Sequence, residues 1–150
     1  YNGRHCTNPQ WWAKWIQETI YEKVLGKSPE GITMIKVKGG KQDEQLLVYK
    51  TVNWCLDVGV ISKTPDITVT ICKYNTHNCF GTCVEGDDDM TSFFITVAND
   101  QTIRDFVATL IHELIHVNQY VTGVWTGDGE KECDDRQYPL TDKLWKEGIL

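Results

Sequence analysis

The stretch from Asn99 to Gly123 reads NDQTIRDFVATLIHELIHVNQYVTG, and it decides which architecture we expect for the chain. Its apolar side chains cover most of a helical circumference, a pattern that is typical of a buried helix. These apolar residues are Ile103, Phe106, Val107, Leu110, Ile111, Leu114, Ile115, Val117 and Val121. Asn99-Asp100 is predicted to cap the start of the helix, and Gly123 lies just beyond its expected end near Val121. The sequence therefore predicts one long, buried helix.

Strands are predicted before this helix. Ile67 to Lys73 and Ser92 to Ala98 are rich in β-branched or aromatic residues, which favour strands. Ile32 to Val37 predicts a shorter strand, which Gly39-Gly40 closes. The residues between the two longer strands are predicted to form a loop.

Three further segments are predicted to be helical. The first begins at Asn8-Pro9, a typical N-cap followed by proline, and ends near Gly26. The second runs from Asp43 to Val58, where helical spacing of the apolar residues is clearer than strand alternation. The third runs from Asp128 to Leu150 and is interrupted at Pro139. This mixture of helices and strands is typical of an α+β fold.

The length and composition favour a single domain over residues 1–150. The chain has a mass of 17.2 kDa, with 41% apolar and 24% charged residues, enough for one core. The net charge is −6 and the Lys and Arg residues are scattered, which argues against nucleic acid as a partner. No apolar run approaches the roughly 18 residues that a membrane span needs. The sequence does not decide the oligomeric state.

The cysteines favour disulfides and an oxidising compartment, because their number is even and high for this length. They are Cys6, Cys55, Cys72, Cys79, Cys83 and Cys133. We expect three disulfides, and the sequence does not choose among the fifteen pairings that six cysteines allow. The chain starts at Tyr1 without a leader, as in a processed protein or a piece of a longer one. We predict a secreted or extracellular protein, with reduced cysteines in a cytosolic protein as the alternative.

The long helix contains the segment His112-Glu113-Leu114-Ile115-His116. Residues four apart lie one turn above each other, so both imidazoles can bind one metal ion. Glu113 lies elsewhere on the circumference, where its carboxylate can contact a metal-bound water without binding the metal. Two histidines and a glutamate in a buried helix need compensation, and a zinc ion supplies it. The alternatives are a polar stripe on a solvated face and a hydrogen-bonded polar core.

A third ligand is expected after this helix, because a catalytic zinc usually has three protein ligands and one open position. Glu130 and Asp134 lie four residues apart and share one face of the last helix. We predict Glu130 as the third metal ligand and Asp134 as the partner of the outer N–H of a ligating histidine. Glu132 and, less favoured, Asp142 are alternative ligands. A charged, solvated helix start is the alternative to any ligand here.

Taken together, His112-Glu113-Leu114-Ile115-His116 and Glu130-x-x-Cys133-Asp134 resemble the gluzincin class of zinc metallopeptidases. The second segment is similar to the E-x-x-A-D pattern of that family's glutamate helix, with Cys133 in place of the usual alanine. The resemblance implies a zincin-like fold with a small sheet, an active-site helix and a glutamate helix. It also implies that Glu113 is the general base and that Ser92 to Ala98 edges the cleft. The first 90 residues resemble no family that we can name.

Three further residues are candidates for lesser roles in the same site. Tyr120 is predicted to stabilise the oxyanion, with Tyr138 as the alternative, since phenols often do so in zinc peptidases. Tyrosines at such positions also commonly belong to the core or its rim. Gln119 lies one turn past His116 and is expected to line the cleft.

Other motifs favour structural roles over binding. Cys72, His77, Cys79 and Cys83 have no familiar zinc-finger spacing, so disulfides are preferred to a second zinc site. Asp87-Asp88-Asp89 lacks the alternating spacing of a calcium loop and is expected to be solvated. Trp11, Trp12 and Trp15 are expected to be mostly core residues, and a contact surface is the alternative for Trp11, which lies on the outer side of the first predicted helix.

The sequence thus predicts a zinc metallopeptidase that is stapled by disulfides and acts on a peptide or protein. His112, His116 and Glu130 hold the zinc, and Glu113 activates the metal-bound water. The alternative is a non-catalytic zincin-like module that binds or assembles on an extracellular surface, a virion or a filament. A further alternative is a disulfide-rich toxin or inhibitor that binds no metal.

Overall fold

The computed structural model describes residues 34–74, 79–86 and 91–147. Within these ranges it is a small α+β fold, as expected, with three helices and a four-stranded sheet. The elements are β1 (Ile35–Lys38), α2 (Gln42–Asp57), β2 (Asp66–Cys72), β3 (Gly81–Glu85), β4 (Ser92–Ala98), α4 (Ile103–Thr122) and α5 (Glu130–Lys146). The helix expected near residues 9–26, with Trp11, lies outside the described residues. No helix within these ranges is long and apolar enough to span a membrane.

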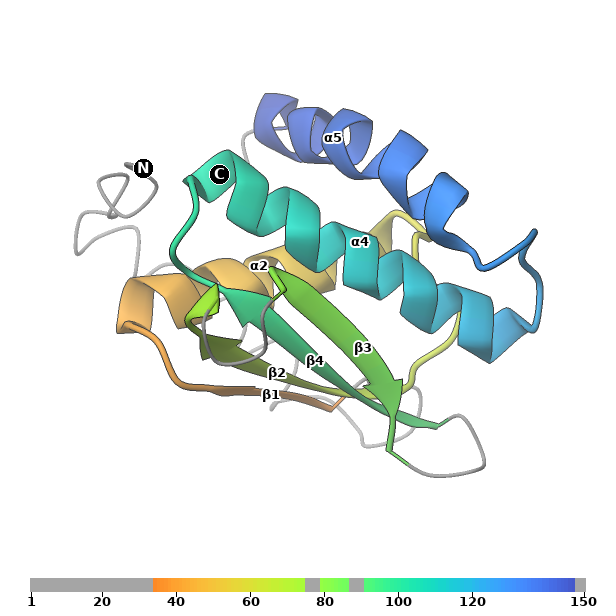
Figure 1. Ribbon diagram of the computed structural model, residues 1–150, viewed down its shortest axis with the longest axis horizontal. Coiled ribbons are helices and arrows are strands. Elements are labelled where there is room, and N and C mark those ends of the chain that lie inside the picture. The colour runs from red at the N-terminus through yellow and green to blue at the C-terminus, as the bar shows by residue number, and fades with distance from the viewer. Residues whose placement is uncertain (1–33, 75–78, 87–90, 148–150) are drawn as a thin grey trace.

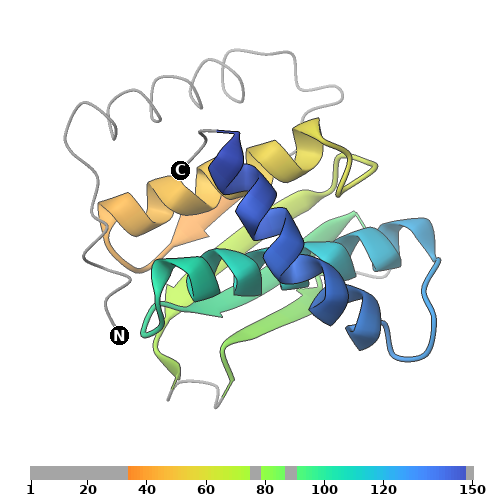
Figure 2. The same cartoon turned by 90° about the horizontal axis from the view of Figure 1, so that it is seen from above.

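The helices lie on one face of the sheet, with α2 and α4 against the strands and α5 across α4 (Figures 1 and 2). Alternation along β2 and β4 directs Ile67, Val69, Phe93 and Ile95 into the core, where each is at most 1% exposed. The apolar residues of α4 are buried against them, as its sequence predicts. This packing fixes the long helix directly above the sheet.

The strand order is β1-β2-β4-β3, and β3, one of the two edge strands, was expected to be a loop. β1, β2 and β4 are parallel, with α2 as the crossover between the first two, whereas β3 is antiparallel to β4. The loop prediction is wrong because an edge strand pairs on one side only, and β3 has no buried residue to mark it. The expectation that Ser92 to Ala98 edges the cleft is also wrong, since β4 lies between β2 and β3.

The ends of α4 are partly as predicted. Gly123 follows the helix with φ +70°, the left-handed conformation that glycine adopts most readily. The N-cap, however, is Thr102, whose hydroxyl accepts a hydrogen bond from the Asp105 backbone N–H. Asn99 and Asp100 do not cap the helix: the Asn99 amide donates to Glu44, and Asp100 accepts from the Tyr74 backbone.

The last helix, α5, continues through Pro139, so the expected interruption there is wrong. A proline inside a helix removes one backbone hydrogen bond and crowds the preceding turn. Thr141 and Leu144, which follow the proline, are both 0% exposed. Burial of these residues holds the last turns in line with the first.

Five of the six cysteines lie among the described residues, and all five have free thiols. Cys55 and Cys133 are buried, whereas Cys72, Cys79 and Cys83 are partly exposed. No disulfide of the expected framework lies among the described residues. Buried cysteines act as small apolar side chains, which explains Cys55 in the core without any bond.

Candidate metal centre

Two histidines on α4 and one glutamate on α5 converge on a single point. His112 and His116 lie one turn apart, with ring centroids separated by 5.1 Å. Glu130 is the first residue of α5, and its Oε2 lies 3.0 Å from His112 Nε2 and 2.8 Å from His116 Nε2. The turn after Gly123 reverses the chain and brings Glu130 back over the histidines. One carboxylate oxygen thus faces both Nε2 atoms.

The outer nitrogen of each histidine contacts a glutamine side chain. His112 Nδ1 lies 2.6 Å from Gln137 Oε1, and His116 Nδ1 lies 2.9 Å from Gln119 Oε1. An amide oxygen only accepts hydrogen bonds, so each Nδ1 carries the proton and donates it. Each neutral ring then directs the lone pair of its Nε2 toward Glu130.

This arrangement favours a proton or a metal ion between the three facing atoms. Two nitrogen lone pairs and a carboxylate oxygen repel one another unless a proton or a metal ion lies between them. In a tetrahedral zinc site with bonds near 2.0 Å, ligand atoms lie roughly 3.3 Å apart, close to the spacing found here. Imidazole nitrogens and a carboxylate oxygen are also typical zinc ligands. The residues therefore fit a zinc ion.

The pKa values of His112 and Glu130 reflect how closely these groups lie to one another. Burial lowers the pKa of His112, but its hydrogen bond with Gln137 and the charges of Glu113 and Glu130 outweigh burial and raise the pKa above its usual value. Burial raises the pKa of Glu130, yet the hydrogen bonds with His116 and His112 bring it below the usual value. Positive charge at this point is thus favoured.

Cys133 lies at the same centre, one turn along α5 from Glu130. Within the described ranges, the group that can hold a metal is His112, His116, Glu130 and Cys133, whose ligand atoms all lie within 4.8 Å of one another. Cys133 is 0% exposed. Burial and the charge of Glu130 raise the pKa of its thiol to about 12. The thiol is therefore protonated until a metal displaces its proton.

Glu113 is buried between α4 and the edge strand β3, at 7% exposure. Burial raises the pKa of its carboxyl to about 7, although the nearby His112 and His116 lower it. A Cβ atom at Gly81 of β3 would lie 2.9 Å from Glu113 Oε2 and 2.6 Å from Thr109 Cγ2. Glycine at this position lets the strand approach the helix closely.

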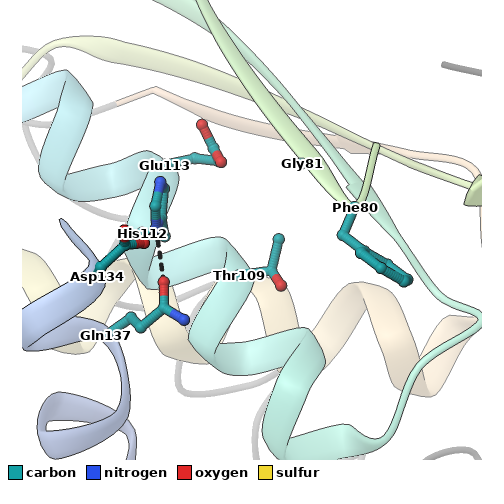
Figure 3. A pocket seen from close by; sticks show the side chains of 7 residues that line it. All are labelled: Phe80, Gly81, Thr109, His112, Glu113, Asp134 and Gln137. Atoms are coloured by element: carbon teal, nitrogen blue, oxygen red, sulfur yellow. Dashed lines mark hydrogen bonds and ion pairs between the residues drawn. The ribbon is translucent and has the colours of Figure 1, made fainter. Parts of the chain in front are cut away.

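A pocket of about 200 Å³ opens beside His112 and Glu113 (Figure 3). Its lining comes from α4, α5 and the start of β3, and consists of Phe80, Gly81, Thr109, His112, Glu113, Asp134 and Gln137. In Figure 3 the Glu113 carboxylate points toward β3, while Gln137 reaches His112 from the opposite side. The pocket therefore brings one candidate ligand, His112, together with Glu113 and the first residue of the edge strand β3.

The structure separates the three acidic residues that were candidates for the third ligand. Glu130 is brought to the histidines, whereas Glu132 accepts hydrogen bonds from Gln119 and Arg136. Asp142 pairs with Arg104 at 3.2 Å, near the other end of α4. Of the three, only Glu130 lies within reach of both Nε2 atoms.

The residues expected around the ligands take different places. Asp134 Oδ1 is 3.5 Å from His112 Nδ1, so Gln137 at 2.6 Å is the closer partner. Gln137 was not among the residues predicted for the site, although it lies seven residues after Glu130 and so on the same helical face. Gln119 was expected to line the cleft, but it is buried behind His116.

The two tyrosines considered for the oxyanion also differ in their surroundings. Tyr120 packs between Phe93 and Trp125, with ring centroids 6.0 Å from each. The Tyr138 hydroxyl donates to Asp105 Oδ1 at 2.7 Å, two turns of α4 before His112. Tyr138 is thus engaged outside the centre, and the role of Tyr120 stays a prediction.

The second zinc site was the less favoured interpretation of the cysteine-rich segment. Cys72 ends β2, with its thiol 3.9 Å from the Val97 carbonyl oxygen, and Cys83 lies on β3. His77 and Asp87-Asp88-Asp89 lie outside the described residues. Cys72, Cys79 and Cys83 do not form a metal-binding group within the described part of the chain.

Comparisons of the chain with models of known protein families, with curated protein sequences and with solved structures find no match, so the geometry of the centre carries the functional argument.

Proposed function

We propose that the protein is a zinc-dependent peptidase of the gluzincin type. The observation that carries this proposal is the single Glu130 oxygen within 3.0 Å of both Nε2 atoms, beside a buried glutamate at an open pocket. His112, His116 and Glu130 would hold the zinc. When bound, zinc lowers the pKa of a water molecule and polarises the carbonyl of the scissile bond.

Glu113 is the proton carrier in this proposal. Its carboxylate takes a proton from the attacking water and later delivers it to the leaving amine, so the proton is balanced over the reaction. A carboxyl whose pKa is about 7 both accepts and donates a proton readily at neutral pH. Its place between α4 and β3 keeps it out of the ligand set and next to the pocket.

An extended peptide is the substrate that this pocket suits best. Among the described residues, β3 pairs on one side only, with β4, so its other edge offers backbone groups to another strand. Pairing with such an edge holds a peptide through its main chain, largely independent of its side chains. The first residue of β3, Gly81, lies against Glu113, so a peptide on this edge would pass the centre.

A second candidate function rests on Cys133. If its sulfur binds the metal, the four protein ligands leave no open position, and the centre is structural. The protein would then be a non-catalytic module for binding or assembly, on an extracellular surface, a virion or a filament. Against this, a thiol with a pKa of about 12 gives up its proton reluctantly.

Zinc content and hydrolysis of a fluorescently labelled, unfolded protein test both candidates. We expect about one zinc per chain in the natively purified protein. Glu113→Gln should keep the zinc and slow hydrolysis by about 10²–10⁴-fold. Full activity in Glu113→Gln would overturn the proposed mechanism. If the unmodified protein takes up no zinc, the proposed function is wrong.

Cys133→Ala separates the open centre from the closed one. An open centre predicts unchanged zinc affinity and retained hydrolysis in this variant. A closed centre predicts weaker zinc binding and no hydrolysis in either protein. Glu113→Gln is the matched control, because it removes a carboxylate beside the centre and no proposed ligand.

A secreted or extracellular location is also proposed, from the even cysteine count alone. Thiol titration of unfolded, unreduced protein tests it. Three disulfides leave no free thiol, whereas six titratable thiols would remove the argument for an oxidising compartment.

A further inference from the structure

Gln119 is a buried glutamine whose amide makes hydrogen bonds at both its oxygen and its nitrogen. It is 4% exposed and lies on α4, three residues after His116. Its Oε1 accepts from His116 Nδ1 at 2.9 Å. Its Nε2 donates to the Gly129 carbonyl oxygen and to Glu132 Oε1, both at 2.9 Å. These two donated bonds use both amide N–H groups, and the Cys133 thiol lies further from the same nitrogen, at 3.9 Å.

The backbone at Gly129 lies close against the Gln119 side chain. It has φ +81° and directly precedes Glu130, as the N-cap of α5. A Cβ atom at this position would lie 2.3 Å from Gln119 Oε1 and 2.9 Å from Gln119 Cδ. Any larger residue would therefore displace the glutamine, in addition to straining the left-handed backbone.

We propose that Gln119 is a positioning residue that couples two ligands of the metal centre. Its oxygen sets the proton on His116 Nδ1 and so directs Nε2 inward, while its nitrogen holds the backbone that carries Glu130. One side chain thus orients a ligand of α4 and places the ligand of α5. The inference rests on the proposed metal site but not on the proposed hydrolysis.

The other glutamine of the centre provides an internal comparison. Gln137 Oε1 contacts His112 Nδ1 and orients that ring in the same way. Gln137 itself belongs to α5, two turns beyond Glu130, so it does not hold the turn at Gly129. Gln119 should therefore matter more for the assembly of the centre than Gln137.

Metal affinity of three leucine variants tests the proposal. Gln119→Leu should weaken zinc binding, measured by chelator competition, by roughly ten- to a hundredfold. It should also change the absorption spectrum of the cobalt-substituted protein, because His116 and Glu130 lose their orientation. Gln137→Leu should weaken binding less. Gln101→Leu is the matched control: Gln101 is 8% exposed and bonds to the Ala98 carbonyl and Thr109, not to a histidine.

The unfolding temperature of each metal-free variant separates positioning from packing. Loss of zinc affinity in Gln119→Leu beyond that in Gln101→Leu, at similar unfolding temperatures, supports the proposal. Equal affinities in the two variants, with an unchanged cobalt spectrum, would overturn it. If the unmodified protein binds zinc without hydrolysing protein, the proposed function fails and the Gln119 proposal is still tested. If it binds no metal, both fail.

Gln119→Glu covers the case in which the leucine variant does not fold. It keeps the size of the side chain and the acceptor for His116, but it loses both N–H donors. We expect zinc affinity between those of the unmodified protein and Gln119→Leu. Affinity equal to the unmodified protein would overturn the coupling to the Glu130 backbone.

Discussion

The two helices that meet at the metal centre are held by different forces. Ten of the 20 residues of α4 are buried, whereas three of the 17 residues of α5 are buried. α5 adds Cys133 and Leu144 to the core, and it also contacts α4 through polar pairs: Gln137 with His112, the Gly129 carbonyl with Gln119, and Tyr138 with Asp105. Hydrophobic burial therefore places the histidines, whereas the position of Glu130 depends more on polar contacts.

This difference bears on how the proposed metal centre would be held together. A helix anchored in the core keeps two ligands fixed whether or not a metal is bound. A helix attached by hydrogen bonds depends on those bonds, several of which also orient the ligands. Stability and metal binding should therefore respond differently to changes in α4 and α5.

The largest effect on stability is expected from Leu114→Ala in α4. Leu114 is 0% exposed, and its truncation should cost about 2–5 kcal/mol of unfolding free energy. Leu140→Ala in α5 is the matched control, because Leu140 is only partly buried. Denaturant unfolding of the metal-free proteins measures both. Equal losses would contradict the view that α4 is anchored in the core more firmly than α5.

Zinc itself should act mainly on α5. At a free concentration 100 times its Kd, zinc should add about 2.7 kcal/mol to the unfolding free energy. Hydrogen exchange should slow more in α5 than in α4, because α5 has less burial to hold it. Glu130→Ala is the control and should show a smaller gain. Equal slowing of hydrogen exchange in both helices would contradict the expectation that zinc acts mainly on α5.

The smallest effect is expected from Tyr138→Phe. This change removes the hydrogen bond to Asp105 at 2.7 Å and should cost about 0.5–1.5 kcal/mol. Unfolding measurements on Tyr138→Phe, Asp105→Ala and the double variant isolate the contribution of the bond. Strict additivity of the two changes would show that this bond does not help to attach α5.

Local sequence patterns predicted the elements in which buried and exposed side chains recur with the period of a strand or a helix. The strand expected at Ser92 to Ala98 has those bounds in the structure, and the helix expected from Asp43 to Val58 is Gln42–Asp57. The end of α4 at Gly123 was equally predictable, because the left-handed cap depends on one residue. β3 was missed because its half-exposed residues carry no clear alternation.

The sequence by itself determined that two histidines share one face of a buried helix, with Glu113 between them in the chain. Helical geometry acts over four residues, so the spacing is sufficient for this conclusion. Only the tertiary structure decided that Glu130, rather than Glu132 or Asp142, reaches them. That choice depends on how α5 crosses α4 after the turn at Gly129, and contacts between distant segments leave no periodic pattern in the chain.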